Sequence, residues 1–270
     1  MSLLAPIHDW PVDHVGAAAI LPDGTLDLAG DTDVVFPLAS LTKLLAALGT
    51  LVATEDGSID LDDPAGPEGS TIRHLLAHAS GLAFDSDAVV APPGTKRIYS
   101  NTGFELLATT VQEATDMPFA AYVGEAVLDP LEMGSSRVEG SPAAGAEGTV
   151  RDLARLAADL MRAEPRVLAR VTRDHATTVA FPGLAGLLPG FGHQDPNDWG
   201  LGFEIRGHKS PHWTPEHASP LTFGHFGRSG SLMWIDPARH AALIVLGDRE
   251  FGSWAPPLWR ELGERVLGSI

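Results

Sequence analysis

One lysine on an apolar helix constrains this chain more than any other feature. Apolar residues recur at three- and four-residue spacing over 44–52, which predicts a largely buried helix that begins near Ala39. Ser40 stands in its first turn and Lys43 follows three residues later, so both side chains lie on one face. A buried lysine is costly unless it is paired or neutral. A lysine close to neutrality beside a hydroxyl has the chemistry of a general base beside a nucleophile.

The Ser40–Lys43 pair also has an ordinary interpretation. The pattern S-x-x-K recurs by chance, and serine commonly caps the start of a helix. Only three of the 18 basic residues are lysines, namely Lys43, Lys96 and Lys209, so a lysine in this helix is not background. Other segments of the chain have to decide between a cap and a nucleophile.

Composition excludes several classes of function. The 270 residues suffice for one large domain or two that share a core. The net charge of −17 argues against nucleic acid or an anionic membrane surface as partner, and the absence of cysteine excludes a thiol nucleophile. No apolar stretch reaches the length of a membrane span, and the first residues lack the pattern of a secretory signal. We therefore expect a cytoplasmic protein, unless a leader has been removed.

Turn residues and hydrophobic periodicity predict strands near both ends of the chain and helices between them. The predicted strands are 14–21, 25–29, 201–205, 222–227, 231–236 and 241–247, and the further helices are 70–78, 102–115, 118–127, 150–161 and 254–266. Segments 141–149 and 180–197 are rich in glycine with alanine or proline and are expected to be loops, the first of them flexible.

This order of elements predicts an α+β fold. We expect an antiparallel β-sheet flanked by N- and C-terminal helices, with a mostly helical region inserted. Residues 1–38 and 199–270 would form the sheet region and 39–198 the helical region. The active site would lie at the interface between them.

Two groups of histidines have the residue type of metal ligands. His74 and His78 are four residues apart on one predicted helix, and loop 208–217 carries three histidines together with Trp213. No third ligand stands near the first pair, and histidines in a loop are commonly surface residues. We predict neither a metal nor a cofactor, and expect Trp213 to border a site.

Two later segments supply groups that a serine nucleophile needs. Tyr99 and Asn101 place a phenol and an amide in a loop just before a helix, and His225-Phe226-Gly227 lies on a candidate edge strand. Singly, these residues could be a packed aromatic, a helix cap and an ordinary strand. Their joint occurrence behind the serine helix favours catalysis.

Together the three motifs resemble those of the serine β-lactamase and penicillin-binding-protein superfamily. The similarity is greatest to the class C branch, with its D-alanyl-D-alanine carboxypeptidase and esterase relatives. It extends to segments 71–82, 93–95 and 129–134 and covers the chain from about Leu21 to Leu246.

The resemblance implies a role for each motif residue. Ser40 would attack a carbonyl and be acylated, while Lys43 and Tyr99 would share the proton transfers in an order that the sequence leaves open. A tyrosine base needs positive charge nearby, which Lys43 or a charged His225 could supply. The oxyanion hole would be the backbone N–H groups of Ser40 and Arg228. The remaining residues would bind the substrate, namely Asn101, His225, Phe226 and Gly227, although Asn101 could instead orient Lys43.

Two departures from the superfamily pattern bear on the substrate, namely the residues of the third motif and the absence of a visible export signal, since peptidoglycan lies outside the cytoplasm. At the position of His225, β-lactamases usually have lysine. At the position of Phe226 they have a residue with a hydroxyl group, which helps to bind the substrate carboxylate. Phenylalanine removes that hydroxyl, although Arg228 could take its place as carboxylate partner. We therefore expect a serine hydrolase that acts through an acyl-enzyme on a small ester or amide, rather than an efficient β-lactamase.

Two alternative functions remain open at the level of sequence. One is a D-alanyl-D-alanine carboxypeptidase or β-lactamase, whose substrate would be a peptide or a lactam. The other, from a different class, is a non-catalytic ligand-binding or penicillin-sensing module. The sequence predicts no oligomeric state.

Overall fold

The computed structural model describes residues 2–270, and its centre is a six-stranded antiparallel sheet. The strand order is β2-β1-β11-β10-β9-β8, so the first strands of the chain pair directly with the last. Along the β1–β11 pair, Ala18 lies opposite Ile244. The strands are β1 (Val15–Ile20), β2 (Leu26–Gly30), β8 (Glu204–Ile205), β9 (Phe223–Gly227), β10 (Ser231–Asp236) and β11 (Ala241–Gly247).

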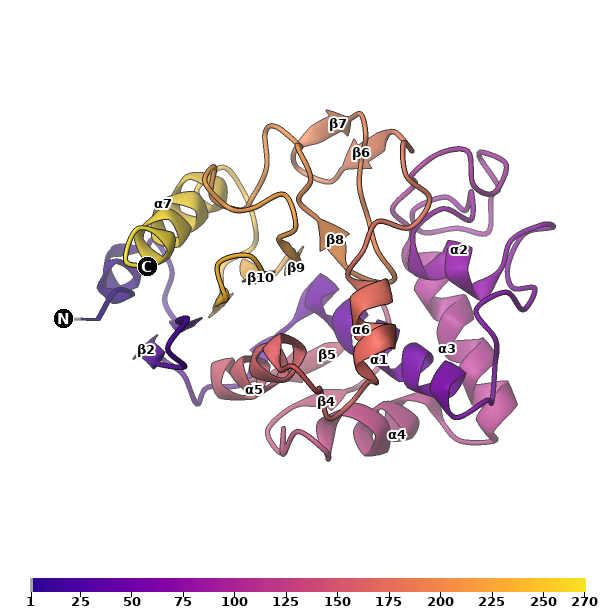
Figure 1. Ribbon diagram of the computed structural model, residues 1–270, viewed down its shortest axis with the longest axis horizontal. Coiled ribbons are helices and arrows are strands. Elements are labelled where there is room, and N and C mark those ends of the chain that lie inside the picture. Colours follow the sequence, from indigo (N-terminus) through magenta and orange to yellow (C-terminus); the bar gives the residue numbers. More distant parts are fainter. Residues whose placement is uncertain (1) are drawn as a thin grey trace.

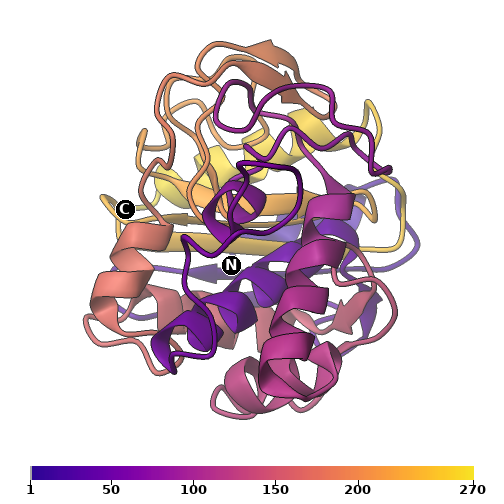
Figure 2. The ribbon, with the colours of Figure 1, turned by 90° about the vertical axis from the view of Figure 1, so that its right-hand side faces the viewer.

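Helices cover both faces of this sheet (Figure 1 and Figure 2). On one face lie α7 (Ala255–Leu267) and the short helix η1 (Ala5–Asp9), and α5 (Val150–Met161) lies on the other. Because both faces are buried, β11 is apolar along its whole length instead of alternating. The α+β prediction, with an antiparallel sheet and flanking terminal helices, is confirmed.

The remaining helices form a region beside the sheet, on the right of Figure 1. They are α1 (Thr42–Glu55), α2 (Ile72–Leu76), α3 (Asn101–Thr115), α4 (Phe119–Val123), the π-helical turn η3 (Gly124–Leu128) and α6 (Arg170–Ala176). Two small sheets accompany them, formed by β3 (Phe36–Pro37), β5 (Ala146–Gly148) and β4 (Arg137–Val138), and by β6 (Gly186–Leu188) and β7 (Gly192–Gln194). The division into a sheet region and a helical region at 38/39 and 198/199 stays a prediction.

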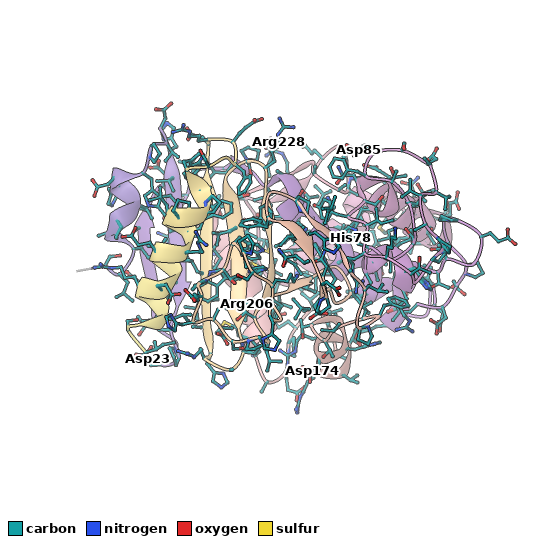
Figure 3. The ribbon with its side chains drawn as sticks, turned by 90° about the horizontal axis from the view of Figure 1, so that it is seen from above. Asp23, His78, Asp85, Asp174, Arg206 and Arg228 are labelled. Carbon is teal, nitrogen blue, oxygen red and sulfur yellow. The ribbon has the colours of Figure 1, made fainter. Side chains whose placement is uncertain are left out.

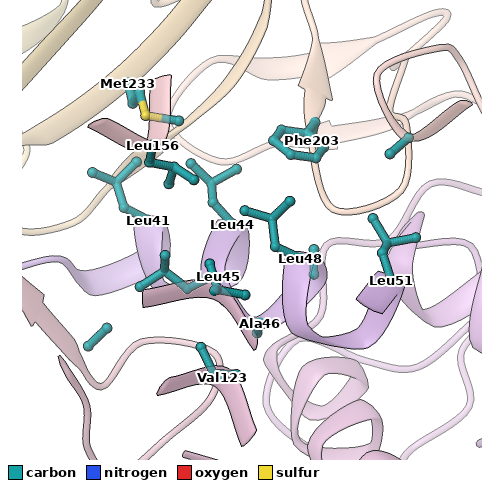
Figure 4. Packing of buried hydrophobic residues seen from close by; sticks show 14 of the residues in the cluster. Leu41, Leu44, Leu45, Ala46, Leu48, Leu51, Val123, Leu156, Phe203 and Met233 are labelled. Atoms are coloured by element: carbon teal, nitrogen blue, oxygen red, sulfur yellow. The ribbon is translucent and has the colours of Figure 1, made fainter. Parts of the chain in front are cut away.

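Helix α1 is the central element of the larger hydrophobic core (Figure 4). Its side chains point in several directions because partners surround it. Leu44, with Leu41 just before the helix, lies toward Met233 of the sheet, and Ala46 faces Val123 of α4. A helix that is apolar on all sides is a buried helix, so the burial predicted from its periodicity is correct.

Three local predictions differ from the structure. The α-helix begins at Thr42, and the preceding residues 39–41 form a 3₁₀ turn, η2, so Ser40 lies in that turn rather than in the α-helix. Segment 180–197 contains the hairpin β6–β7, whose three-residue strands are too short to give a periodic signal. Segment 141–149 packs against α1 and contains β5, with Ala143 fully buried.

No helix among residues 2–270 combines the length and the apolar character needed to cross a bilayer.

Candidate active site

The turn that carries Ser40 is held against the end of β9. Ala39 has a φ of 45°, in the left-handed region that residues with a side chain rarely adopt, immediately before the serine. A Cβ on Gly227 would lie 2.6 Å from the Leu38 carbonyl oxygen, and the Ser231 hydroxyl donates to that same oxygen at 3.3 Å. Only glycine permits this close approach. Consequently Arg228, the residue after Gly227, lies beside the turn that carries Ser40.

Strand β9 exposes part of its outer edge to the site. β8 pairs only with Phe223 and Gly224, so within residues 2–270 no strand pairs with His225–Gly227 on that side. The prediction of an edge strand is therefore correct for the motif itself.

Lys43 is fully buried, and its ammonium group meets only neutral acceptors. Nζ donates to Oδ1 of Asn101 at 2.6 Å and to the carbonyl oxygen of Ala143 at 2.9 Å. It also lies 4.8 Å from the centre of the Tyr99 ring. Burial lowers the pKa of Lys43 to about 7, although the more distant charges of Asp85 and Glu105 oppose the shift. Near neutral pH a large fraction of this lysine is the free amine.

The start of α3 positions Tyr99 and Asn101. Ser100 is the N-cap, since its hydroxyl accepts from the Gly103 N–H at 3.1 Å, and Asn101 is the first helical residue. The interpretation of Asn101 as the cap is therefore wrong, and its amide is free to bond Lys43. His78 stabilises this turn, because its Nδ1 accepts a hydrogen bond from the Ser100 N–H at 3.2 Å.

Tyr99 sits among aromatic rings. Its ring packs on His78 at 4.5 Å, on Trp199 at 5.7 Å and on Phe84 at 5.9 Å between centroids. Burial raises the pKa of the phenol above its usual range, while a hydrogen bond with Ser40 acts in the opposite direction. The phenol is accordingly protonated at neutral pH.

The tautomer of His225 follows from its partners. Nδ1 lies 2.6 Å from the carbonyl oxygen of Phe226, which can only accept, so Nδ1 carries the proton. Nε2 then has a free lone pair, which faces the Tyr99 hydroxyl at 3.4 Å. Burial, assisted by the Lys43 charge, lowers the pKa of His225 to about 4. The expectation that His225 supplies positive charge to Tyr99 is therefore wrong, because the imidazole is neutral.

A cavity of about 200 Å³ opens in front of these groups. Ser40, Tyr99, His225, Phe226 and Arg228 all line it. Its other walls are largely apolar, formed by Phe84, Leu188, Pro189, Gly190, Trp199 and Phe251. Arg228 is exposed at the rim, and Figure 3 shows it along one edge of the molecule, with His78 toward the interior.

Of the residues predicted from sequence, Ser40, Tyr99, His225, Phe226 and Arg228 line the cavity. Lys43, bonded to Asn101, lies over the Tyr99 ring, and Gly227 packs against the serine turn. Sequence reasoning missed Phe84, Trp199, Ala143 and the hairpin β6–β7. It selected Trp213 as the site tryptophan, but Trp213 lies behind the cavity wall, packed on Phe226 at 5.7 Å and donating to Glu204. Trp199 takes that place, since it lines the cavity and its ring packs edge-on against His225 at 5.4 Å between centroids.

The three-histidine loop is held by a buried ion cluster. Glu204 accepts from Lys209 at 2.6 Å and from Nε2 of His212 at 2.7 Å. His212 is thus a buried structural residue rather than the surface residue that sequence favoured. Within residues 2–270 no three carboxylate or imidazole groups converge in a way that suits a metal ion.

Arg97 holds separate backbone segments together, which leads to a prediction about stability. Its buried guanidinium donates to the carbonyl oxygens of four residues, Ala77, Ala180, Phe181 and Asn197. Arg97→Met leaves these carbonyls without a donor, so we expect a loss of about 3 kcal/mol in the free energy of unfolding. Urea unfolding measures it. Arg151→Met, which breaks only the exposed pair with Asp33, is the control, and equal small losses in both variants would contradict the prediction.

A match to the β-lactamase family model spans residues 15–262 of this chain. The chain belongs to the β-lactamase family. A β-lactamase from Mycobacterium bovis is 52% identical, with a TM-score of 0.97 over 99% of both chains. The superfamily predicted from the motifs, that of serine β-lactamases and penicillin-binding proteins, is confirmed.

More distant proteins that resemble this chain differ from it in length and name. Penicillin-binding protein 4* of Bacillus subtilis is 31% identical over 40% of this chain and 31% of its own length. This chain spans less than half the length of the curated relatives that it matches. EstCE1, a hydrolase with promiscuous acyltransferase activity, shares the fold at a TM-score of 0.76 and 17% identity, over 98% of this chain and 97% of that one.

Proposed function

We propose that this β-lactamase-fold hydrolase forms an acyl-enzyme at Ser40 and cleaves small, uncharged esters or amides. The observation that carries the proposal is the buried Lys43, which is close to neutrality and lies one helical turn from a serine in a strained turn. A purely structural lysine would be paired with a carboxylate, whereas the direct partners of Lys43 are neutral.

In this proposal Lys43 is the general base for acylation. A base whose pKa is near the working pH combines a large reactive fraction with useful basicity. Tyr99 is protonated, so its hydroxyl cannot take the serine proton without giving up its own. We assign it as the proton donor to the leaving group, and Lys43, which has taken the proton of Ser40, then returns that proton to Tyr99. The free lone pair of His225 Nε2 faces the Tyr99 hydroxyl at 3.4 Å and can accept a hydrogen bond from it. The sequence left the order of Lys43 and Tyr99 open, and the burial of both groups favours the lysine.

The oxyanion that develops as the acyl-enzyme forms and breaks down would be stabilised by backbone N–H groups. We place the carbonyl oxygen of the substrate between the N–H of Ser40 and that of Arg228, which the close approach at Gly227 brings together. The free edge of β9 beside His225 would bind the substrate backbone or acyl chain, and the second N–H of the Asn101 amide would hold its polar end.

Phe226 supports a preference for uncharged acyl groups. It lines the cavity and packs on Phe191 and Phe251 at 5.6 and 5.3 Å, so the wall at this position is aromatic. A carboxylate placed there would lose its hydration without gaining a partner, which costs several kcal/mol. We expect efficient hydrolysis of short-chain p-nitrophenyl esters and poor turnover of a chromogenic cephalosporin.

Phe226→Thr tests this preference. Restoring a hydroxyl should raise the ratio of cephalosporin to ester kcat/KM by about tenfold, the worth of one hydrogen bond to a charged group. Phe226→Leu is the control, since it enlarges the cavity without a donor. If both variants change the ratio equally, space and not the hydroxyl controls specificity. A thermal melt of each variant checks that the aromatic cluster still folds.

A carboxypeptidase or β-lactamase remains the second candidate function. Two observations favour it, the exposed Arg228 at the cavity rim and the 52% identity to a protein called a β-lactamase. An activity profile across esters, D-alanyl-D-alanine peptides and β-lactams separates the two candidates. Peptide or lactam kcat/KM above that of every ester would replace our proposal.

A further inference from the structure

Asp85 is the charged residue that contacts the site from outside the cavity. Its Oδ1 accepts from Nδ2 of Asn101 at 2.7 Å, while Oδ1 of the same amide accepts from Lys43 at 2.6 Å. The carboxylate, the amide and the ammonium are therefore joined by consecutive hydrogen bonds. In Figure 3 Asp85 lies at the same edge of the molecule as Arg228.

The loop that carries Asp85 is fastened to the start of α3. The Ala83 carbonyl oxygen accepts from the Ser100 hydroxyl at 2.7 Å, and the Phe84 carbonyl oxygen accepts from the Asn101 N–H at 2.7 Å. Phe84 also packs on Tyr99 and lines the cavity. Three successive loop residues thus contact the segment that supplies Tyr99 and Asn101, which makes the position of Asp85 a fixed feature of the site.

The groups on either side of the Asn101 amide, the Lys43 ammonium and the Asp85 carboxylate, determine how this amide is oriented. An ammonium group can only donate, and an ionised carboxylate can only accept. The amide oxygen must therefore face Lys43 and the amide nitrogen must face Asp85. Without the carboxylate, nothing on that side distinguishes this orientation from the flipped one, in which the NH₂ group would face the lysine and repel its proton.

We propose that Asp85 is a positioning residue, which locks the Asn101 amide toward Lys43 and places a negative charge that favours the protonated lysine. The inference rests on the proposed role of Lys43 as general base. Through Asn101, Asp85 would set the pH at which the base becomes available, without touching the substrate.

Several other groups lie around Lys43, and their effects on its charge have to be distinguished from that of Asp85. Glu105 of α3 is the second carboxylate, and its charge, like that of Asp85, favours protonated Lys43. His78, two residues after α2, and His225 of β9 are buried and have lowered pKa values, so both are neutral, and Tyr99 is a neutral phenol. Glu105 accepts from the Ser141 hydroxyl and not from Asn101, so it provides charge without positioning.

The experiment compares three variants by two readouts, the pH profile of ester kcat/KM and the titration of Lys43 by NMR. Because the chain has only three lysines, isotope-labelled lysine gives three side-chain signals, and the Lys43 signal is the one lost in Lys43→Met. Asp85→Asn and Glu105→Gln remove one charge each and keep an oxygen acceptor. Asp85→Ala removes both the charge and the acceptor.

We expect Asp85→Asn to lower the titration midpoint of Lys43 and the acid limb of kcat/KM together, by about half a pH unit. At pH 6 this corresponds to about threefold faster ester hydrolysis than in the wild type. Glu105→Gln should shift the midpoint in the same direction. Asp85→Ala should show the shift and in addition a high-pH plateau about fivefold below that of Asp85→Asn, because its Asn101 amide is no longer locked.

The outcomes separate this inference from the proposed function. A Lys43 midpoint that is the same in wild type and Asp85→Asn overturns the electrostatic part, and equal plateaus in Asp85→Asn and Asp85→Ala overturn the positioning part. If the wild type hydrolyses no ester, the proposed function fails. The NMR titration still decides whether Asp85 acts on Lys43.

Discussion

Ser40→Ala should lower ester kcat/KM by at least about 1000-fold, since loss of a nucleophile removes the covalent route and leaves only the binding groups. The assay uses p-nitrophenyl acetate and butyrate with purified protein. The substitution removes one oxygen from a half-exposed position in η2, so the fold should persist. Equal unfolding curves for variant and wild type would establish that the loss is chemical.

A fluorophosphonate probe separates the hydrolase from a non-catalytic binding module. Mass spectrometry should find the wild-type protein labelled at Ser40 and the Ala variant unlabelled, because only an activated hydroxyl attacks phosphorus at a useful rate. Ser100→Ala is the matched control, since Ser100 is a buried serine in the same region whose hydroxyl is used as a cap. Labelling of wild type and Ser40→Ala at another residue would sink the nucleophile assignment, and no labelling at all would favour the binding module.

The sequence predicted those parts of the site that follow from short-range geometry. Ser40 and Lys43 share a face because they are three residues apart, and Tyr99 and Asn101 share the start of one helix. Long apolar runs predicted β10, β11 and α1 because burial on all sides requires them. In each of these cases the pattern and the structure have the same physical cause.

Contacts between distant segments could not be read in this way. Asp85 reaches Asn101 because its loop is joined to the start of α3 through the carbonyl oxygens of Ala83 and Phe84, a group that every residue type has. Ala143 contributes a carbonyl oxygen, which every residue type has, so no sequence signal identifies it. The choice between Trp199 and Trp213 depends on contacts of the folded chain, since Trp199 packs on His225 and lines the cavity while Trp213 packs on Phe226 and donates to the buried Glu204.

Lys43→Met should abolish most activity and, at the same time, stabilise the protein. Loss of the general base should lower ester kcat/KM by about 100- to 10,000-fold. The gain in stability arises because folding transfers an ammonium group into an apolar interior, which lowers its pKa from 10.5 to about 7. Methionine has a similar length and no charge to bury. Asn101 and the Ala143 carbonyl lose a donor, which offsets part of the gain.

The pH dependence of this stability gain identifies its cause. Between pH 7 and 10.5 the lysine binds a proton in the unfolded chain but not in the folded protein. The free energy of unfolding of the wild type therefore rises with pH across this window. Below about pH 7 the full cost of burying the charged lysine is present. The advantage of Lys43→Met in the free energy of unfolding should therefore shrink by about 3 kcal/mol from pH 7 to pH 9.5. Lys96→Met, at an exposed lysine, should show no such trend. A constant difference between Lys43→Met and wild type would mean that Lys43 is charged in the folded protein throughout this range, and it could not then act as the base near neutral pH.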